Sequence, residues 1–507
     1  MVKTIKLFLI LFFVFARNVE GYIFDPNPLL QQASQCLEKG NFVQAIENYN
    51  IVYSYAQDKS VKAFALVRMA DISALFLDQK KLAKDYYKKA IADFKGCKEL
   101  KNAYFNLAML CYEQQELTQS LRYFKMFIKL FPEDIRYSTA QYMLDRINRE
   151  LKTAPCKQKV SVSPELRKEP KIRVLLVKSI QVEFIFPKGF YLNKSFYPSG
   201  RYFFTVQNKN LFLNQKKLDR FVFLKDYGYV KFKDKIYRGW LALKVKNKQL
   251  LVINYLPLEE YLKGVVPKEM SPAWPLEALK AQAVAARSYA YFLHLKSEDK
   301  DYDLYSDVGS QVYGGVSSHL RSKRAVDETR GIILFYKNRP VLAYFHAHSG
   351  GVLESAQNVW KVNFPYFKIK QDYYSNEAKK MYWQAEVPLS KLEQVLHDKG
   401  FGLAGIKRIK CAKFSPSGRV EAFEIQARNG RILLASNSLR IWLGPFWVKS
   451  TLCKVSQQGN KIYFSGKGYG HGVGMSQWGA YNLAQKGKDY QKILQFYYPG
   501  TKLKRLY

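Results

Sequence analysis

One acidic residue, Glu269, lies where a carboxyl group could act as a general acid and base. It stands beside Val266, Met270 and Trp274, just before a helix predicted to begin at Leu276. The positive end of a helix lowers the pKa of a carboxyl group, whereas apolar neighbours raise it, and an acid catalyst requires the second effect to dominate. From these residues alone, a simple charge partner of the helix N-terminus is the commoner interpretation, so both roles stay open.

The helix that follows is predicted from a single apolar stripe. Its members recur at alternating spacings of three and four residues: Leu276, Leu279, Ala283, Ala286, Ala290 and Leu293. Ser271, Pro272 and Pro275 mark its beginning. Glu277 is a rival carboxyl group, but the stripe places it on the helix surface near Lys280. We therefore expect an ion pair between these two residues rather than catalysis.

Residues 261–290 resemble the signature of the stage II sporulation protein D family (SpoIID/LytB). Members of that family include peptidoglycan lytic transglycosylases and proteins described as amidase enhancers. Later blocks resemble the family in the same order, at residues 311–315, 329–331, 344–351, 468–480 and 493–501. The resemblance covers about residues 172–507. It implies that Glu269, the acidic residue of a Glu-Met-Ser motif, is the catalytic residue.

The implied chemistry needs only one carboxyl group. A hydrolysing glycosidase uses two carboxylates, whereas a lytic transglycosylase can use one Glu as acid on the glycosidic oxygen and then as base on the muramyl C6 hydroxyl. The product carries a 1,6-anhydromuramyl end. The predicted function is cleavage of glycan strands, preferentially those freed of peptides, in cell wall remodelling or sporulation. The alternative is a non-catalytic, wall-binding amidase enhancer.

Two glycine-rich segments supply further candidates. In residues 346–351, which also include His348, histidine and serine side chains could hydrogen-bond sugar hydroxyls; bonding inside a strand-to-loop turn is the alternative. Glycines at 468, 470, 472 and 474 predict close backbone packing or positive φ, not a phosphate cradle. The predicted substrate-binding residues, with the first two as supports on the helix, are Gln282, Arg287, His346, Ser349, Gly350, Gly351, His471, Ser476 and Gln477.

We predict no cofactor and no metal. Some members of the family bind zinc through a His and cysteines before the Gln-Val-Tyr block, whereas residues 303–310 here read Asp-Leu-Tyr-Ser-Asp-Val-Gly-Ser. Asp and Ser alone are a poor ligand set for tetrahedral zinc. Buried free thiols are expected for Cys36, Cys97, Cys111, Cys156, Cys411 and Cys453, although a disulfide between the nearest pair, Cys97 and Cys111, stays open.

The first 21 residues resemble a secretory signal. Lys3 and Lys6 precede an apolar run at 7–16 that is too short to span a membrane, and residues 19–21 suit a cleavage site. Export to the periplasm, the cell envelope or the outside is therefore expected. An uncleaved anchor is the alternative, with membrane contact that is at most peripheral.

Residues 22–150 look helical and repetitive, and residues 151–171, with three prolines, read as a linker. The anchors Phe42, Leu82 and Leu117 are 40 and 35 residues apart, close to the period of about 34 in tetratricopeptide repeats. Such repeats commonly bind a partner, such as an amidase or another wall enzyme, although packing on the neighbouring domain is the alternative. Short β-branched and aromatic runs at 172–177, 202–206, 240–245 and 250–254 predict strands, so we expect an α+β chain.

The charge is strongly positive and unevenly spread. The chain of 507 residues holds 81 Lys and Arg against 42 Asp and Glu, a net +39, but residues 22–150 hold 18 against 15. A basic domain outside the cytoplasm meets anionic wall polymers or lipid head groups, although solvated lysines explain part of the excess. Because the signal segment predicts export, we expect the basic domain to bind peptidoglycan glycan strands rather than nucleic acid.

Overall fold

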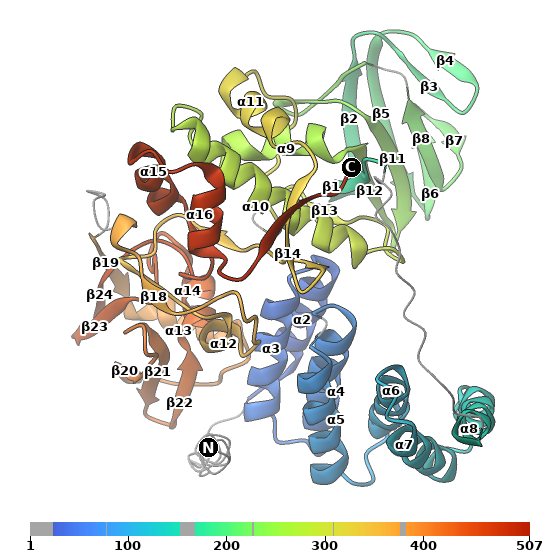
Figure 1. The fold of residues 1–507 in the computed structure, drawn as a ribbon, viewed down its shortest axis with the longest axis vertical. Coiled ribbons are helices and arrows are strands. Elements are labelled where there is room, and N and C mark those ends of the chain that lie inside the picture. Colours follow the sequence, from blue (N-terminus) through green and yellow to red (C-terminus); the bar gives the residue numbers. More distant parts are fainter. Residues whose placement is uncertain (1–23, 78, 153–167, 226–227, 308, 376–381) are drawn as a thin grey trace.

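The computed structural model describes residues 24–507 apart from 78, 153–167, 226–227, 308 and 376–381. The predicted signal at 1–21, Cys156 and most of the predicted linker lie outside the described residues. A helical part comes first and a strand-rich part follows, which confirms the expected α+β class (Figure 1).

The helical part is built from antiparallel neighbours. Its elements in the described chain are α2 (Asn27–Glu38), α3 (Phe42–Tyr55), α4 (Lys59–Leu75), α5 (Lys80–Asp93), α6 (Leu100–Glu113), α7 (Leu117–Leu130) and α8 (Tyr137–Lys152). Helices α2 and α3, α4 and α5, and α6 and α7 pack as pairs. The anchors Phe42, Leu82 and Leu117 lie in the first turn of the second helix of each pair, which is consistent with tetratricopeptide-like repeats.

Two sheets begin the strand-rich part. Their strands are β1 (Lys171–Ser179), β2 (Gln181–Phe186), β3 (Phe190–Leu192), β4 (Ser195–Tyr197), β5 (Gly200–Gln207), β6 (Asn210–Leu213), β7 (Lys216–Leu218), β8 (Phe221–Lys225), β9 (Val230–Phe232), β10 (Lys235–Tyr237), β11 (Trp240–Lys246), β12 (Gln249–Pro257) and β13 (Leu304–Tyr305). One sheet has the order β13-β1-β12-β11-β8-β3-β4 and the other β10-β9-β2-β5-β6-β7. The predicted runs at 172–177, 202–206, 240–245 and 250–254 fall in β1, β5, β11 and β12.

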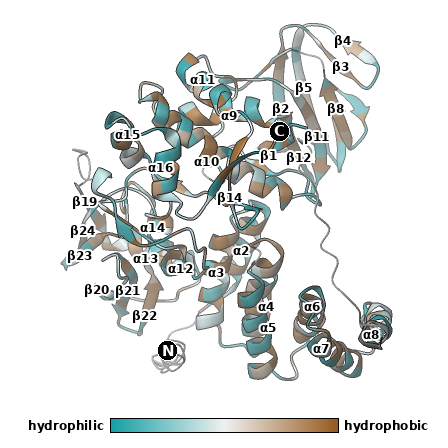
Figure 2. Cartoon of the chain, viewed as in Figure 1, coloured by the Kyte–Doolittle hydropathy of each residue, from teal (hydrophilic) through white to brown (hydrophobic). Residues whose placement is uncertain are grey.

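Helix α10 (Leu276–Leu295) is the central element of the rest of the chain and begins where the sequence predicts. Its residues from Ala281 to Leu293 are all buried, and Figure 2 shows it as largely hydrophobic. It packs against α9 (Leu258–Glu269), α11 (Leu320–Glu328), α15 (Gln477–Gln485), α16 (Tyr490–Tyr497) and β14 (Ile332–Tyr336).

Short elements complete the described chain. The small sheets comprise β14 with β15 (Arg339–Pro340) and β26 (Lys502–Arg505), β16 (Phe345–His346) with β25 (Met475–Ser476), β17 (Val352–Leu353) with β18 (Lys370–Gln371), β19 (Tyr382–Pro388) with β24 (Lys461–Lys467) and β23 (Cys453–Gln458), and β20 (Ile406–Phe414) with β21 (Val420–Ala427) and β22 (Gly430–Ala435). The helices are α12 (Ala356–Trp360), η1 (Tyr373–Ser375), α13 (Leu389–His397) and α14 (Ser436–Leu443).

The first helical pair packs directly on the strand-rich part, as the alternative for the repeats foresaw. Glu47 of α3 is buried and accepts hydrogen bonds from Ser438 and from Asn437 Nδ2 at 3.3 Å. The Tyr55 hydroxyl donates to the Leu433 carbonyl at 2.7 Å and accepts from the Leu433 N–H at 3.0 Å. These contacts make α3 part of the same body as the second half of the chain.

We expect the Tyr55→Phe variant to lower the free energy of unfolding by about 1–2 kcal/mol, because it removes both hydrogen bonds to Leu433 at little cost in packing. Urea unfolding followed by circular dichroism measures the change. Tyr53→Phe is the matched control from the same helix and should stay within about 0.5 kcal/mol of the unaltered protein. An equal loss in both variants would contradict a specific bond across this contact.

Candidate active site

Glu269 is the last residue of α9, and a short loop connects it to α10. The sequence did not predict α9, because its interior contains Gly264 and Pro267, both of which disfavour helix. The carboxyl group therefore lies at the negative end of one helix as well as before the positive end of the next. The two helix ends oppose each other in their effect on its ionisation.

The surroundings of Glu269 favour the protonated acid. Burial raises the pKa of this carboxyl group, and the hydrogen bond from the Val312 N–H to Oε1, 2.8 Å long, lowers it less, so the pKa is raised above 4.5. Oε2 has no hydrogen-bond partner among the described residues. One oxygen is thus held in place while the other remains able to exchange a proton.

The block at 311–315 holds the Val312 amide in position. Gln311 is buried, accepts from the Tyr261 hydroxyl at 3.2 Å and donates to the Ala286 carbonyl at 3.4 Å. The Tyr313 hydroxyl donates to Asn254 Oδ1 of β12 at 3.1 Å. These bonds link α9, α10 and the sheet around the single N–H that contacts Glu269.

A glycine in α9 is required for this approach. The Gly314 N–H donates to the Gly264 carbonyl at 3.0 Å. A Cβ atom on Gly264 would lie 2.4 Å from the Gly315 carbonyl oxygen and 2.6 Å from the Tyr313 ring, both too close. The glycine that weakens α9 as a helix is therefore the residue that lets the Val312 segment reach the carboxyl group.

Three half-buried aromatic side chains gather beside the loop that follows Glu269. The ring of Trp274 lies 4.8 Å from that of Trp478 and 5.0 Å from that of Tyr481, measured between centroids. Sequence analysis noted Trp274 only as a neighbour of the carboxyl group and assigned no role to Trp478 or Tyr481. Trp478 lies inside the family-like block at 468–480, and this position could have marked it as a candidate site residue.

The structure brings together Gln282, a predicted support, and Gln477, a predicted substrate-binding residue. Gln477 at the start of α15 donates from Nε2 to Gln282 Oε1 of α10 at 3.4 Å, and both side chains are buried. The Nε2 group of Gln282 is buried without a hydrogen-bond partner among the described residues. It is therefore an available donor in the interior near the contact of α10 and α15.

Arg287 has a structural position rather than the contact with substrate that we expected. Its side chain is fully buried and forms a bidentate ion pair with Glu259, at 2.9 and 2.7 Å. Further bonds reach the Ile332 and Val326 carbonyls. With every side of the guanidinium inside the protein, Arg287 supports the site only by fixing α9 against α10.

Buried side chains of the segments at 346–351 and 468–476 belong to one hydrogen-bond network, although Tyr469 of the second segment is 44% exposed. His346 of β16 lies opposite Ser476 of β25, and the Ser349 hydroxyl donates to Asp372 at 2.8 Å. The Ser375 hydroxyl bonds Asp372 at 2.6 Å and Ser476 at 2.8 Å. Ser349 and Ser476 thus bond to side chains from a distant part of the described chain, and their contact with a sugar stays a prediction.

Close backbone packing explains the glycines of both segments. All four of Gly468, Gly470, Gly472 and Gly474 have positive φ, as expected, and so do Gly350 and Gly351. A Cβ atom on Gly468 would lie 2.7 Å from the Gly350 nitrogen. The two predicted glycine segments therefore contact one another through their backbones.

The three histidines of these segments are neutral near pH 7. Burial lowers the pKa of His348 to about 4 and that of His471 to about 3, and it holds the pKa of His346 well below its usual value. The rings of His346 and His471 are 5.4 Å apart between centroids. Neutral, buried imidazoles can bond to sugars or to the backbone but supply no positive charge to a polyanion.

The rival carboxyl group is engaged as the sequence predicts. Glu277 pairs with Lys280 at 2.7 Å, and its second oxygen accepts from the Tyr490 N–H at 2.8 Å. Both interactions place Glu277 on the outside of α10 toward α16. Its role is to join these helices.

Metal ligands, disulfides and membrane-spanning helices can each be assessed in the described residues. These residues contain no cluster of three or more His, Cys, Asp or Glu that could hold a metal ion, and Asp303 is engaged by Arg173 and His294. The five cysteines within the described ranges are free, which leaves Cys97 and Cys111 unbridged. No helix in the part of the chain that the structure describes has the length and apolar character needed to cross a membrane.

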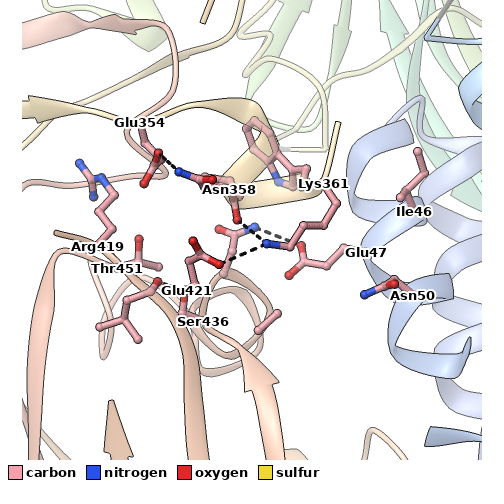
Figure 3. Close-up of a pocket in the computed structure, with 15 residues that line it drawn as sticks. Ile46, Glu47, Asn50, Glu354, Asn358, Lys361, Arg419, Glu421, Ser436 and Thr451 are labelled. Carbon is pink, nitrogen blue, oxygen red and sulfur yellow. Dashed lines mark hydrogen bonds and ion pairs between the residues drawn. The ribbon is translucent and has the colours of Figure 1, made fainter. Parts of the chain in front are cut away.

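A cavity of about 40 Å³ lies between α3 and the strand-rich part, away from Glu269 (Figure 3). Glu47, Lys361, Arg419 and Glu421 line it, and Lys361 Nζ is 3.5 Å from Glu421 Oε2. A space of this size holds about one water molecule. It belongs to the joint between the two parts of the chain.

Several known proteins are similar to part of the chain. A family model described as stage II sporulation protein matches residues 246–336, and another, described as a domain of unknown function, matches residues 352–474. An uncharacterized protein of Brachyspira hyodysenteriae is 39% identical over 267 residues, 52% of this chain and 71% of that protein. The stage II sporulation protein D of Bacillus subtilis is 32% identical over 267 residues, 50% of this chain and 75% of that protein. The amidase enhancer of Bacillus subtilis is 31% identical over 291 residues, 48% of this chain but 40% of its own length.

The raised pKa of Glu269 predicts a pH-dependent cost to folding. A carboxyl group with a raised pKa in the folded state contributes stability below pH 4.5 that is lost as the pH rises through the folded value. We expect Glu269→Gln, which keeps an acceptor for the Val312 N–H, to gain in melting temperature relative to the unaltered protein as the pH is raised from 4.5 toward neutrality. Thermal unfolding across that range tests this, with Glu277→Gln as control, and a difference that stays constant with pH would contradict it.

Proposed function

Because the chain belongs to the stage II sporulation protein D family, we propose that it is a peptidoglycan lytic transglycosylase in which Glu269 is the single acid and base. Family membership supports a cell-wall-related function. The observation that carries the finer proposal is the half-buried carboxyl group of Glu269. Its pKa is raised, and one of its two oxygens has no hydrogen-bond partner among the described residues. A raised pKa favours the protonated form of the carboxyl group, which is the form that the first step requires.

The proposed reaction balances without water. The Glu269 carboxylic acid donates its proton to the glycosidic oxygen as the bond from that oxygen to muramyl C1 breaks. The carboxylate then takes the proton of the C6 hydroxyl while the C6 oxygen bonds to C1, which closes the 1,6-anhydro ring and restores the acid. Val312 supports both steps, because its N–H stabilises the carboxylate formed between them.

The contacts of Glu269 are compatible with a mechanism that uses one carboxyl group. Burial raises its pKa, the Val312 N–H lowers it less, and no ion pair joins Glu269 to a charged side chain in the described ranges. The aromatic rings of Trp274, Trp478 and Tyr481 offer apolar surfaces on which a sugar could pack beside the carboxyl group.

The second candidate is a non-catalytic activator of an amidase, which the name of one relative favours. This chain spans less than half the length of that relative. Export to the cell envelope and the use of the helical repeats to bind a wall enzyme are part of the proposal in either case. Exposed apolar side chains on the repeats, such as Leu75 and Ile135, support a partner there.

Replacing the catalytic group decides between the two candidates. Glu269→Gln should abolish the release of 1,6-anhydromuramyl ends from purified glycan strands, with acid and base catalysis alone accounting for about 10²–10⁴-fold. Glu277→Gln, which removes a carboxyl group from the same region, should retain the activity. Mass spectrometry of the products measures both. Undiminished anhydro ends from the Glu269 variant would refute the assignment and favour the activator.

The net charge predicts which strands the protein prefers. Removal of the stem peptide leaves a carboxylate on each muramyl sugar, so a denuded strand is a polyanion that the basic strand-rich part should attract. The Glu269→Gln variant should bind denuded strands more tightly than peptide-bearing strands, and less tightly as salt exceeds about 0.15 M, where charges more than about 8 Å apart are screened. Equal affinities, or no dependence on salt, would remove the electrostatic basis for this preference.

A further inference from the structure

The positive charge of the chain is most concentrated in the strands that precede α9. Residues 171–257 hold 18 Lys and Arg but only 4 Asp and Glu. The matched family model begins at residue 246, so most of this segment lies outside it. A segment this basic attracts anionic polymers, and the positions of its lysines decide where such a polymer can bind.

One face of the larger sheet carries a row of aromatic rings. Ring centroids of Phe223 lie 4.9 Å from Phe221, 6.3 Å from Trp240 and 5.3 Å from Tyr255. The row thus crosses the neighbouring strands β8, β11 and β12, a width of about 10 Å at the usual strand spacing. Phe221 is 46% exposed, and the other three rings are half-buried. Figure 2 shows hydrophobic and hydrophilic residues mixed along β8 and β11.

Two lysines lie over this row. Lys171 Nζ is 4.3 Å and Lys225 Nζ is 4.5 Å from the centroid of the Trp240 ring. No acidic residue in the described ranges pairs with either of them, whereas Lys244 and Lys246 share Asp301. The ring holds the two ammonium groups by cation–π attraction, and within the described residues no carboxylate neutralises their charge. We call these two lysines and four rings the aromatic–lysine face.

The chain itself covers the other end of this sheet surface. There Tyr302 and Tyr305 pack with Ala242, Leu251 and Ile253, all of which are buried, and Phe223 and Tyr255 pack against this cluster. Phe221 is 46% exposed, so the part of the aromatic–lysine face that stays open lies around Phe221 and the uncovered sides of the half-buried rings. Its composition, rings flanked by surplus cations, matches a ligand with both apolar surface and negative charge.

The aromatic–lysine face lies on the opposite side of the sheet from the scaffold of Glu269. Neighbouring residues of a strand point to opposite faces, so Tyr255 and Asn254 of β12 diverge. Asn254 is buried and accepts from Tyr313, next to the residue whose N–H contacts Glu269. A ligand on the aromatic–lysine face therefore does not compete for the catalytic carboxyl group.

We propose that the aromatic–lysine face is a second, non-catalytic binding site for a peptide-free glycan strand. The identity of this occupant rests on the proposed function. Sugar rings present apolar C–H surfaces that pack on Phe221 and on the uncovered sides of the half-buried rings, and the muramyl carboxylates pair with Lys171 and Lys225. A row that crosses several strands suits an extended polymer better than a small anion. The face holds the wall polymer while the catalytic region cuts it.

The first experiment measures binding without cleavage. In the full chain carrying Glu269→Gln, we add Lys171→Gln and Lys225→Gln together, and we measure fluorescence anisotropy of end-labelled glycan strands stripped of peptides by an amidase. Two exposed ion pairs predict a loss of affinity of about tenfold near 0.15 M salt. Lys407→Gln with Lys454→Gln, exposed lysines on β20 and β23, remove the same charge elsewhere and should change affinity less than twofold. Equal losses in the two double variants, or none, would overturn the proposal.

The second experiment separates this site from the catalytic one. In the chain with Glu269 intact, the Lys171 and Lys225 variants should release anhydro ends from short soluble strands at an unchanged rate. The two proposals can also fail separately. If the unaltered protein releases no anhydro ends, but the Lys171 and Lys225 double variant binds strands more weakly than the unaltered protein does, the proposed function fails and the second site stands. If the double variant loses binding to vesicles containing phosphatidylglycerol but keeps strand binding, the face is a membrane contact and the proposal is overturned.

Discussion

The ion pair between Arg287 and Glu259 is the interaction on which the arrangement of the second half of the chain depends. It joins α10 to α9, and Glu259 also accepts from the Gly331 N–H at 3.0 Å and from the Tyr507 hydroxyl at 2.5 Å. Burial alone would raise the pKa of Glu259, but Arg287 and these hydrogen bonds outweigh it and hold the pKa below its usual value. Loss of one partner of such a pair costs about 3–5 kcal/mol, because the other charge is left buried. The block at 329–331 is explained by this pair, since it supplies the backbone and hydroxyl groups that complete it.

The position of Glu269 follows from that pair through α9. Glu259 fixes the beginning of the helix, and the catalytic candidate is at its end. Between them, Gly264 admits the chain at 313–315 close to the helix backbone, which brings the Val312 N–H to the carboxyl group. The buried ion pair at the start of α9 and the glycine within it thus determine where the Glu269 carboxyl group lies and which N–H contacts it.

Sequence patterns predicted those parts of the fold in which a local period reports burial. The stripe of α10 gave its first residue, and β-branched runs gave β1, β5, β11 and β12. Helix α9 was missed because Gly264 and Pro267 both disfavour helix, and Gly264 is present for a tertiary contact that the local pattern does not show. The hydrogen bond from the Val312 N–H to Glu269 could not be predicted for another reason. Its donor is a backbone group, and the pattern of side chains along the sequence does not show which backbone N–H bonds to a carboxyl group. Arg287 was assigned to substrate because an arginine near a motif gives no sign of whether its partner is a ligand or a buried Glu.

The hydroxyl of Tyr55 also affects the edge of the sheet that it contacts. Strand β22 is at the edge of its sheet, and its outward N–H and C=O groups would otherwise be open to any extended chain. Tyr55, the last residue of α3, occupies one such N–H and one such C=O at Leu433. At this point of the edge, the helical part therefore takes the place that a strand of another chain would need for pairing.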